Sequence, residues 1–201
     1  MEEKIIARGA EAIIKRISFF GLPAIAKQRV KKSYRQESID SSLRKTRTKA
    51  EAYILHSAKQ AGVRCPVVYS ASETELVVSD VKGELLHDLL KQKGAGKAVE
   101  EVGKNLARLH SADMVHGDFT TSNVIVDGKK VWLIDFGLGG FATDLEEKAI
   151  DVLLMERSLG DEKLFKAFTK GYSEYKNAGR VLKQMSEITK RGRYVKSRKE
   201  K

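Results

Sequence analysis

Cysteine and long apolar runs are the features that this sequence lacks. Cys65 is the single cysteine among 201 residues, so we expect no disulfide within the chain, no disulfide-linked partner and a reducing compartment. No stretch approaches the roughly 20 apolar residues of a membrane-spanning helix, and residues 1–4 lack a signal-peptide pattern. We therefore expect a soluble, cytoplasmic protein with no membrane partner.

Clusters of cysteine and histidine, which mark many zinc sites, are missing as well. His110 and His116 are isolated histidines. We interpret the first as a helix-end residue and the second as an orienting residue of a loop. The length of 201 residues suits one ordinary domain or two small lobes that share a cleft.

Positive charge is abundant and unevenly distributed. The chain has 38 Lys and Arg against 27 Asp and Glu, a net charge of +11. Residues 24–49 and residues 180–201 each contain nine basic and two acidic residues, so each block carries a net charge of +7. A polyanionic partner and a pair of solvated faces both explain such blocks, and the sequence alone does not choose between them.

Residues 114–137 are the most informative segment. Asp118 in an H-x-D sequence, then Asn123, then Asp135 in D-F-G follow one another in the order used by protein kinases. The alternative is an ordinary hairpin with scattered polar residues, but order, offset and turn together argue against it. We therefore expect Asp118 to be catalytic, and Asn123 and Asp135 to hold Mg²⁺ on a nucleotide.

A hairpin explains how these side chains would meet. Two short strands are expected at residues 124–126 and 130–134, joined by a tight turn at Asp127-Gly128. The second strand would return the chain, so that Asp135 lies beside the loop that carries Asp118 and Asn123.

Upstream, the pattern predicts a small antiparallel lobe over residues 1–81. Lys27 lies among apolar residues of a predicted strand, the position from which a kinase lysine holds the α- and β-phosphates. We expect Glu51 to pair with it, because Ala50, Tyr53 and Ile54 mark that side of the helix as lobe-facing. Two unrelated surface residues are the alternative. Strands are expected at residues 4–7, 12–18, 24–30, 67–70 and 75–81, and a helix from Asp40 or Ser41 as its cap to about Gln60.

Glycine is scarce where a phosphate-binding loop is expected. Gly9 is the single glycine in the segment Gly9, Ala10, Glu11 and Ala12. Backbone N–H groups can cradle phosphate without further glycines, and a plain hairpin turn is the alternative.

The remaining residues predict a helical lobe and a tail. Helices are expected within residues 82–190, at 84–91, 97–112, 143–158, 162–175 and 182–190, around the loop and hairpin. Residues 191–201 are charge-rich and poor in apolar side chains, which predicts a flexible basic tail. The expected fold class is α+β, with two lobes and a nucleotide cleft near Lys82.

Several motifs resemble one kinase family. They are G-A-E-A from Gly9, K-x-R-x-x-K-x-Y-R from Lys27, R-x-x-x-E-A from Arg47, H-G-D-F-T-T-S-N, D-F-G-L, and R-G-R from Arg191. Together they are similar to the small atypical kinase of the KEOPS complex, the archaeal and eukaryotic machine for tRNA threonylcarbamoyladenosine. The resemblance covers nearly the whole chain. It implies a protein-kinase-like fold with a minimal C-lobe that lacks the activation segment, which fits the short length.

The resemblance also implies a function. It implies a Ser/Thr protein kinase or ATPase that uses ATP and Mg²⁺ and serves a threonylcarbamoyl-transferase subunit, with a small bridging subunit and tRNA as further partners. It gives Asp118 the role of catalytic base or water-orienting group, and it places Asp80 in the hinge that meets adenine. By the same resemblance, Lys27 holds phosphates, Glu51 positions Lys27, and Asn123 and Asp135 hold Mg²⁺. The tail residues that would reach tRNA or the partner are Arg191, Arg193, Lys196 and Arg198.

Three alternatives stay open. RIO kinases also carry H-G-D, but they have D-x-D where this chain has D-F-G, and they add an N-terminal winged-helix domain without a counterpart here. Small-molecule kinases of the aminoglycoside and choline type need a large helical C-lobe, for which this chain is too short. A nucleotide-binding scaffold with little phosphoryl transfer is the third. The intact motifs argue against a scaffold, yet they do not separate an ATPase from a protein kinase.

Overall fold

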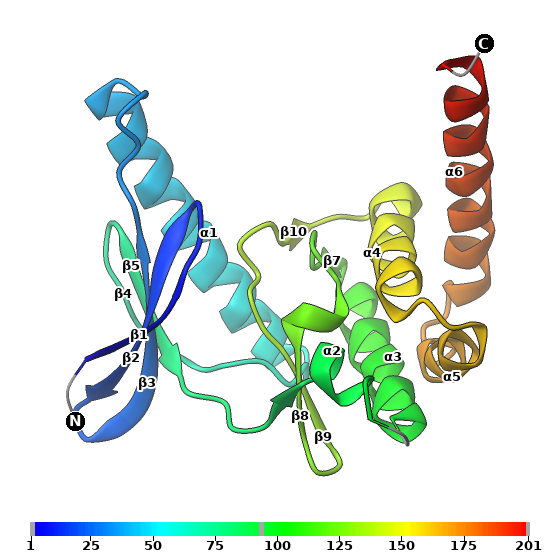
Figure 1. Ribbon diagram of the computed structural model, residues 1–201, viewed down its shortest axis with the longest axis horizontal. Coiled ribbons are helices and arrows are strands. Elements are labelled where there is room, and N and C mark those ends of the chain that lie inside the picture. The colour runs from blue at the N-terminus through cyan, green and yellow to red at the C-terminus, as the bar shows by residue number, and fades with distance from the viewer. Residues whose placement is uncertain (1–2, 93–94, 200–201) are drawn as a thin grey trace.

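The computed structural model describes residues 3–92 and 95–199, and from residue 192 onward it describes the backbone alone. Figure 1 shows an antiparallel sheet on one side and a mainly helical part on the other, with the long helix α1 (Glu37–Gln60) between them. The strands of the sheet are β1 (Lys4–Arg8), β2 (Ala12–Phe19), β3 (Leu22–Arg29), β4 (Val68–Ala71) and β5 (Glu75–Ser79). This is the α+β architecture that the sequence predicts.

The sheet has the strand order β1-β2-β3-β5-β4. Successive side chains of a strand point to opposite faces. In β3, Ala24 and Ala26 are buried against Val77 on one face, whereas Ile25 and Lys27 line a cavity on the other. The alternation in β3 thus directs Lys27 into this cavity.

Helix α1 begins at Glu37, earlier than the predicted start at Asp40 or Ser41. Asp40 is fully buried inside the helix. Its carboxylate accepts hydrogen bonds from the backbone N–H of Lys32, at 3.2 Å, and from Nε of Arg44, at 2.7 Å. The predicted cap is wrong because this side chain attaches the preceding loop to the side of the helix.

The buried face of α1 also differs from the prediction. Ala50 and Tyr53, which were expected to face the lobe, are exposed. Glu51 nevertheless lies on the buried face, with 3% of its surface exposed. The residues of this face are Asp40, Thr48, Glu51, Ile54, Leu55 and Ala58.

The helical part contains the remaining elements. The helix expected at residues 84–91 is a short strand followed by a single helical turn, because the first two residues pair with the later hairpin. The elements are β6 (Glu84–Leu85), α2 (Leu86–Leu89), α3 (Gly96–Ser111), β7 (Met114–Val115), the 3-10 turn η1 (Thr121–Asn123), β8 (Val124–Asp127), β9 (Lys130–Leu133), β10 (Gly140–Phe141), α4 (Leu145–Leu159), α5 (Glu162–Tyr172) and α6 (Ala178–Lys199).

The hairpin of β8 and β9 forms as predicted. Asp127 pairs with Lys130 across the turn, and Gly128 there has a φ of 56°, which glycine adopts without strain. The backbone N–H of Ile134 donates to the carbonyl oxygen of Asn123 at 3.0 Å. This bond holds the residue before Asp135 against the start of β8.

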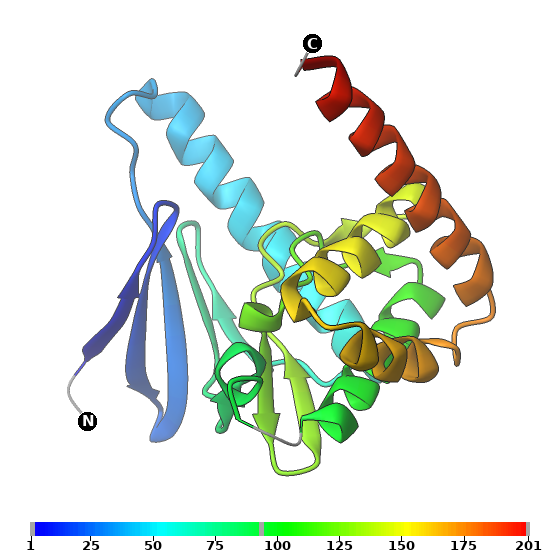
Figure 2. The ribbon, with the colours of Figure 1, turned by 45° about the vertical axis from the view of Figure 1, so that its right-hand side comes forward.

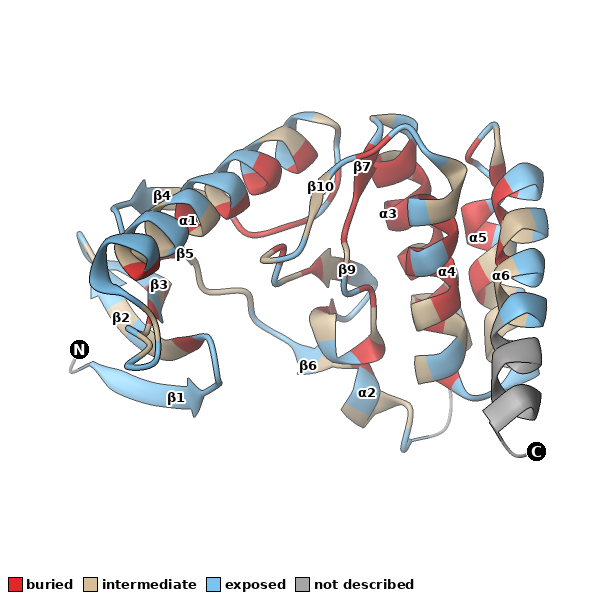
Figure 3. Ribbon diagram, turned by 90° about the horizontal axis from the view of Figure 1, so that it is seen from above, coloured by how far each residue is buried: buried red, intermediate tan, exposed pale blue. Residues whose placement is uncertain are grey.

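Most buried residues lie in the helical part and on the inner side of α1, as Figure 3 shows. Helices α3 and α5 approach so closely that a Cβ on Gly103 would lie 2.1 Å from the carbonyl oxygen of Phe168. A Cβ on Gly171 would lie 2.0 Å from the carbonyl oxygen of Glu100. Only glycine permits this contact, which packs α5 directly behind α3.

Helix α6 runs from Ala178 to Lys199 and extends beyond the end of α4 (Figure 2). The prediction of a structureless tail from residue 191 is therefore wrong for residues 191–199, and residues 200–201 lie outside the described part. Val181 and Met185 are buried and anchor the first half of the helix. Lys, Arg, Gln and Met are favourable helix formers, so the helix continues once it is anchored.

The predicted lobe boundaries can be located on this fold. The boundary between residues 81 and 82 falls between β5 and β6. This boundary, and the end of the second lobe at residue 190, stay predictions. Among the residues that the structure describes, no helix combines the length and the apolar character needed to cross a membrane.

Candidate active site

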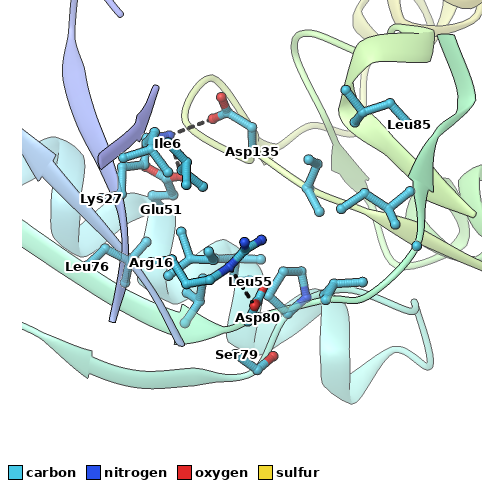
Figure 4. Close-up of a pocket in the computed structure, with 18 residues that line it drawn as sticks. Ile6, Arg16, Lys27, Glu51, Leu55, Leu76, Ser79, Asp80, Leu85 and Asp135 are labelled. Atoms are coloured by element: carbon cyan, nitrogen blue, oxygen red, sulfur yellow. Dashed lines mark hydrogen bonds and ion pairs between the residues drawn. The ribbon is translucent and has the colours of Figure 1, made fainter. Parts of the chain in front are cut away.

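Lys27 bridges two carboxylates at the centre of the site. Its Nζ donates to Oε1 of Glu51 at 2.8 Å and to Oδ1 of Asp135 at 2.6 Å. Figure 4 shows the three side chains converging from β3, α1 and the segment after β9. The sheet, the long helix and the hairpin therefore meet at one ammonium group.

A second cation, Arg29, contacts the same glutamate. Nη2 of Arg29 lies 2.6 Å from Oε2 of Glu51, and the two side chains are only 6% and 3% exposed. Sequence reasoning gave Arg29 no role. A signal was present, because a residue two positions after Lys27 on a strand points to the same face.

Asp135 has an unusual backbone. Its φ is 60°, which is uncommon for any residue with a side chain. Burial raises the pKa of the Asp135 carboxyl, but the charge and hydrogen bond of Lys27 and the N–H of Gly137 outweigh burial and hold the pKa below its usual value. This carboxylate stays ionised at neutral pH and is suited to bind a cation.

Asp118 and Asn123 are joined directly. Nδ2 of Asn123 donates to the carbonyl oxygen of Asp118 at 2.8 Å and to its Oδ2 at 2.9 Å. These bonds leave the amide oxygen of Asn123 available as a ligand. The loop thus presents a carboxylate and an amide oxygen, with the backbone of Asn123 held by the hairpin.

A buried carboxylate, Asp151 of α4, holds this loop from behind. Its Oδ2 accepts the N–H of His116 at 2.7 Å, and its Oδ1 accepts the N–H of Gly117 at 2.9 Å. Nε2 of His110 lies 3.3 Å from Oδ2. Sequence reasoning missed Asp151, although a lone acid in the apolar run of α4 was a signal.

The two histidines are buried behind the loop. Burial lowers the pKa of both His110 and His116 below the usual value. Nε2 of His116 lies 3.0 Å from the carbonyl oxygen of Ile134, so the neutral ring ties the loop to the end of the hairpin. The described contacts of His116 match an orienting role, and His110 lies near the end of α3.

An apolar cavity of about 310 Å³ lies between the sheet and the hairpin. The ion pair of Lys27 with Asp135 lies at one end, and Arg16 with Asp80 lies at another (Figure 4). An apolar cavity with charged groups at its ends suits a nucleotide, whose base is largely apolar and whose phosphates are charged. The apolar lining includes Ile14, Ile25, Leu76, Val78, Ile125 and Ile134.

A second cavity of about 370 Å³ continues past Lys27 and Asp135 toward Asp118. The predicted phosphate-loop residues Gly9, Ala10, Glu11 and Ala12 line it, together with Arg29, Arg47, Gly137 and Leu138. The loop is attached on two sides, because Lys32 Nζ contacts the carbonyl oxygen of Ala10 and Arg47 Nη1 lies 2.8 Å from Oε2 of Glu11. The structure thus brings the predicted loop to the Lys27 end of the apolar cavity.

Asp80 is held by contacts within the protein. Its backbone N–H donates to the carbonyl oxygen of Pro23 at 3.2 Å. Its carboxylate accepts Nε of Arg16 at 3.0 Å and lies 3.6 Å from Nζ of Lys82. The N–H of the predicted hinge residue is therefore already used, although Asp80 and Val81 line the apolar cavity.

The predicted tail residues lie far along α6. Nη2 of Arg191 lies 3.2 Å from Oε1 of Glu146 on α4, in an exposed ion pair. The side chains of Arg193, Lys196 and Arg198 fall outside the described part of the structure. Of these four side chains only that of Arg191 is described, and it pairs with α4 and lines neither cavity.

Most of the cations in residues 24–49 have partners within the chain. Most positive charges of this block are therefore offset by partners within the chain, which argues against a basic surface that is free to bind a polyanion. The contacts join Lys27 to Glu51 and Asp135, Arg29 to Glu51, Lys31 to Glu37, Lys32 to the Ala10 carbonyl oxygen, Arg35 and Arg44 to Asp40, Lys45 to Glu73, and Arg47 to Glu11.

The described residues show no site at which protein side chains alone would bind a metal ion. Within residues 3–92 and 95–199, no group of three His, Cys, Asp or Glu side chains is arranged to hold a metal ion. Asn123 and Asp135 each have a side-chain oxygen that could bind Mg²⁺ arriving with nucleotide phosphates and water.

Comparison with known proteins identifies the family. The family model described as the RIO domain matches residues 23–156. The KEOPS complex subunit Bud32 of Pyrococcus abyssi is 37% identical over 211 residues, which cover 95% of this chain and 96% of that protein. The chain belongs to the Bud32 family of RIO-domain proteins. The D-F-G sequence at Asp135 distinguishes this chain from RIO kinases, which have D-x-D there. The match shows that this chain and the RIO kinases nevertheless belong to one wider family.

Other relatives of this Bud32-family chain are much longer. The probable bifunctional tRNA threonylcarbamoyladenosine biosynthesis protein of Methanobrevibacter smithii is 36% identical over 205 residues, which cover 97% of this chain. Its namesake from Methanosarcina acetivorans is 38% identical over 181 residues, covering 87% of this chain. The matched parts are 37% and 32% of those proteins, so the chain spans about a third of their length.

Solved structures identify the fold of this Bud32-family chain. The Rio2 kinase–ADP/Mg²⁺–phosphoaspartate complex from Chaetomium thermophilum has a TM-score of 0.62 at 14% identity, covering 96% of this chain and 72% of that one. ADP-bound aminoglycoside phosphotransferase APH(2'')-Ib has a TM-score of 0.64 at 12% identity, covering 92% and 81%. The predicted protein-kinase-like fold is confirmed.

Proposed function

We propose that this Bud32-family chain is an ATP- and Mg²⁺-dependent phosphotransferase or ATPase that serves tRNA threonylcarbamoyladenosine synthesis. The observation that carries the proposal is the convergence of Lys27, Glu51 and Asp135 at 2.6–2.8 Å, at the junction of an apolar cavity and a polar cavity. Asp118 lines the same polar cavity. This arrangement suits a triphosphate whose base lies in the apolar cavity.

Each residue has a distinct part in the proposed reaction. Lys27 would turn from Asp135 to the nucleotide phosphates while Glu51 keeps it in place. Asn123 and Asp135 would hold Mg²⁺, which would neutralise charge on the phosphates when bound. Asp118 would orient an attacking hydroxyl or water in line with the terminal phosphate.

The relatives support the biological setting. The Pyrococcus abyssi protein is named a KEOPS complex subunit, and the longer relatives are named for tRNA threonylcarbamoyladenosine biosynthesis. We extend this to the present chain and propose a threonylcarbamoyl-transferase subunit, a small bridging subunit and tRNA as its partners. Action on tRNA fits a cytoplasmic location.

Of the two basic blocks, residues 180–201 are the better candidate for an RNA contact. The cations of residues 24–49 mostly have acidic or carbonyl partners. Block 180–201 has nine basic residues against two acids and lies largely on α6, which extends from the body (Figure 2). Phosphate contacts by such a helix would weaken with salt.

The test is ATP turnover by the purified chain, alone and with the transferase subunit and tRNA. Asp135→Ala and Asp118→Ala should each lower turnover by at least about a hundredfold, the usual effect of losing a positioned catalytic or metal-holding group. Far-UV circular dichroism checks that both variants stay folded. Near-normal turnover in a folded Asp135→Ala protein would leave a scaffold as the better interpretation.

A further inference from the structure

Glu51 is the only described residue that accepts side-chain hydrogen bonds from both Lys27 and Arg29. Lys27 binds Oε1 at 2.8 Å and Arg29 binds Oε2 at 2.6 Å. Arg29 is 6% exposed and Glu51 is 3% exposed. A buried carboxylate thus has one cation on each oxygen, and the two cations come from alternate positions of β3.

Arg29 also contacts the helix backbone. Its Nη2 lies 3.4 Å from the carbonyl oxygen of Arg47, one turn before Glu51. The guanidinium therefore touches both ends of one turn of α1. Both contacts come from Nη2. A lysine would restore the charge, but its side chain is shorter and lacks the planar guanidinium group.

Charge balance explains what a second cation achieves. Lys27, Arg29, Glu51 and Asp135 form a cluster of two positive and two negative groups. Without Arg29, one buried oxygen of Glu51 would lose its partner, and Lys27 alone would have to neutralise this carboxylate. Lys27 would then be drawn toward Glu51 and away from any phosphate.

We infer that Arg29 is a positioning residue that keeps Glu51 neutralised and α1 in place, so that Lys27 is free to engage nucleotide phosphates. The inference rests on the proposed function, because it assigns the ligand of Lys27. It also supplies a restraint on α1 from within the sheet. Strand β10 contacts α1 at another point, where the ring centroids of Phe141 and Tyr53 lie 5.6 Å apart.

The expected effect follows from the contacts. Arg29→Met should weaken Mg²⁺-ADP binding on the order of tenfold, which is the usual effect of losing one charge-assisted hydrogen bond. Arg29→Lys should recover part of the loss, because it restores the charge on a shorter side chain. Glu51→Gln removes the carboxylate, so Arg29→Met added to it should cost little more.

The experiment measures Mg²⁺-ADP binding by calorimetry for the wild type, these three single variants and the Arg29→Met/Glu51→Gln double variant. Arg44→Met is the matched control. Like Arg29, Arg44 pairs with a buried carboxylate, that of Asp40, at 2.7 Å. In the Arg44→Met variant Asp40 would still have Arg35 as a partner at 3.8 Å. Hydrogen–deuterium exchange of residues 47–55 is recorded for the same proteins without nucleotide.

The inference requires three results together. Arg29→Met must bind Mg²⁺-ADP more weakly, must expose residues 47–55 to faster exchange, and must be non-additive with Glu51→Gln, while Arg44→Met does none of these. Unchanged affinity and exchange in Arg29→Met, or losses that add in the double variant, would overturn it. A wild type that fails to bind Mg²⁺-ADP would instead refute the proposed function, and exchange in residues 47–55 would then decide the role of Arg29 alone.

Discussion

Lys27 and Glu51 form one unit at the scale of single residues, because their 2.8 Å contact is buried on the Glu51 side. We expect Lys27→Ala and Glu51→Ala each to lower ATP turnover strongly. The double variant should be little worse than the worse single variant, since each substitution already removes the same phosphate contact. Turnover by all four proteins at saturating nucleotide measures the cycle.

A control for this double-mutant cycle is an ion pair that should not affect turnover. Lys45 and Glu73 form an exposed ion pair outside both cavities, so their alanine variants should leave turnover nearly unchanged. Additive losses for Lys27 and Glu51 would mean that the glutamate acts apart from the lysine.

His110 makes stability depend on pH. In the unfolded chain a histidine takes up its proton near pH 6.5, whereas burial lowers the pKa of His110 in the folded protein. Below about pH 6.5 the unfolded state therefore binds more protons, and stability falls as the pH falls toward the folded pKa. Urea unfolding at about pH 7.5 and 5.5 should show this loss, and His110→Gln should make it smaller.

His110→Gln also removes the 2.7 Å contact with the hydroxyl of Tyr172, which lowers stability at both pH values. The quantity to compare is therefore the change in the free energy of unfolding between about pH 7.5 and pH 5.5 in each protein. His116 is buried with a lowered pKa too, so part of the pH dependence should persist in the variant. An equal loss in both proteins would show that His110 does not contribute.

At the scale of elements, α6 is the part whose removal separates binding from stability. Deleting residues 191–201 should weaken tRNA or partner binding and flatten its salt dependence, because cations that contact phosphate would be lost. Stability should hardly change, since the described contact of this segment is the exposed ion pair of Arg191 with Glu146. Binding titrations at several salt concentrations and a thermal melt measure the two effects.

A control for the deletion lies outside the basic block of residues 180–201. Lys166 of α5 forms an exposed ion pair with Glu162 at 2.8 Å, so Lys166→Ala should leave both binding and stability nearly unchanged. Equal binding by the full-length and truncated proteins at every salt concentration would leave the end of α6 without an RNA role. A large drop in melting temperature would mean that the deleted turns pack on the body.

The elements differ in how far sequence could predict them. The β8–β9 hairpin was predictable, because Asp127-Gly128 and strand periodicity are local signals. The face of α1 was not, because Ala50 and Tyr53 follow a helical pattern yet lie exposed. The end of α6 was mistaken for a tail, because low apolar content does not prevent helix extension once the first turns pack.

At the scale of the whole molecule, nucleotide should join the sheet to the helical part. At a hundredfold excess over its dissociation constant, Mg²⁺-ADP should add about 2.7 kcal/mol to the free energy of unfolding. For a protein of this size the melting temperature should rise by roughly 5–11 °C. Differential scanning fluorimetry measures the shift, and chelation of Mg²⁺ should reduce it.

Asp135→Ala serves as the control for this shift, because it removes a proposed Mg²⁺ ligand. Its melting temperature should respond to ADP almost equally with and without Mg²⁺. A full Mg²⁺-dependent shift in this variant would show that the cation is held elsewhere.

The candidate site as a whole was only half visible in the sequence. Asp118, Asn123 and Asp135 are spaced along one short segment, so their meeting follows from local geometry. Arg29 and Asp151 act through partners far along the chain, Glu51 and the backbone of His116. A local pattern marks both residues, but it does not name their partners, which depend on how the sheet and the helices pack.

The positive φ of Asp135 affects which residues evolution would favour at this position. At a φ of 60°, glycine would be unstrained, whereas a side chain costs on the order of 1 kcal/mol. Selection for a stable fold and selection for a cation ligand therefore favour different residues at this position. In a descendant lineage released from nucleotide chemistry, glycine or asparagine should replace this aspartate early, while Asp151, which the fold itself needs, should persist.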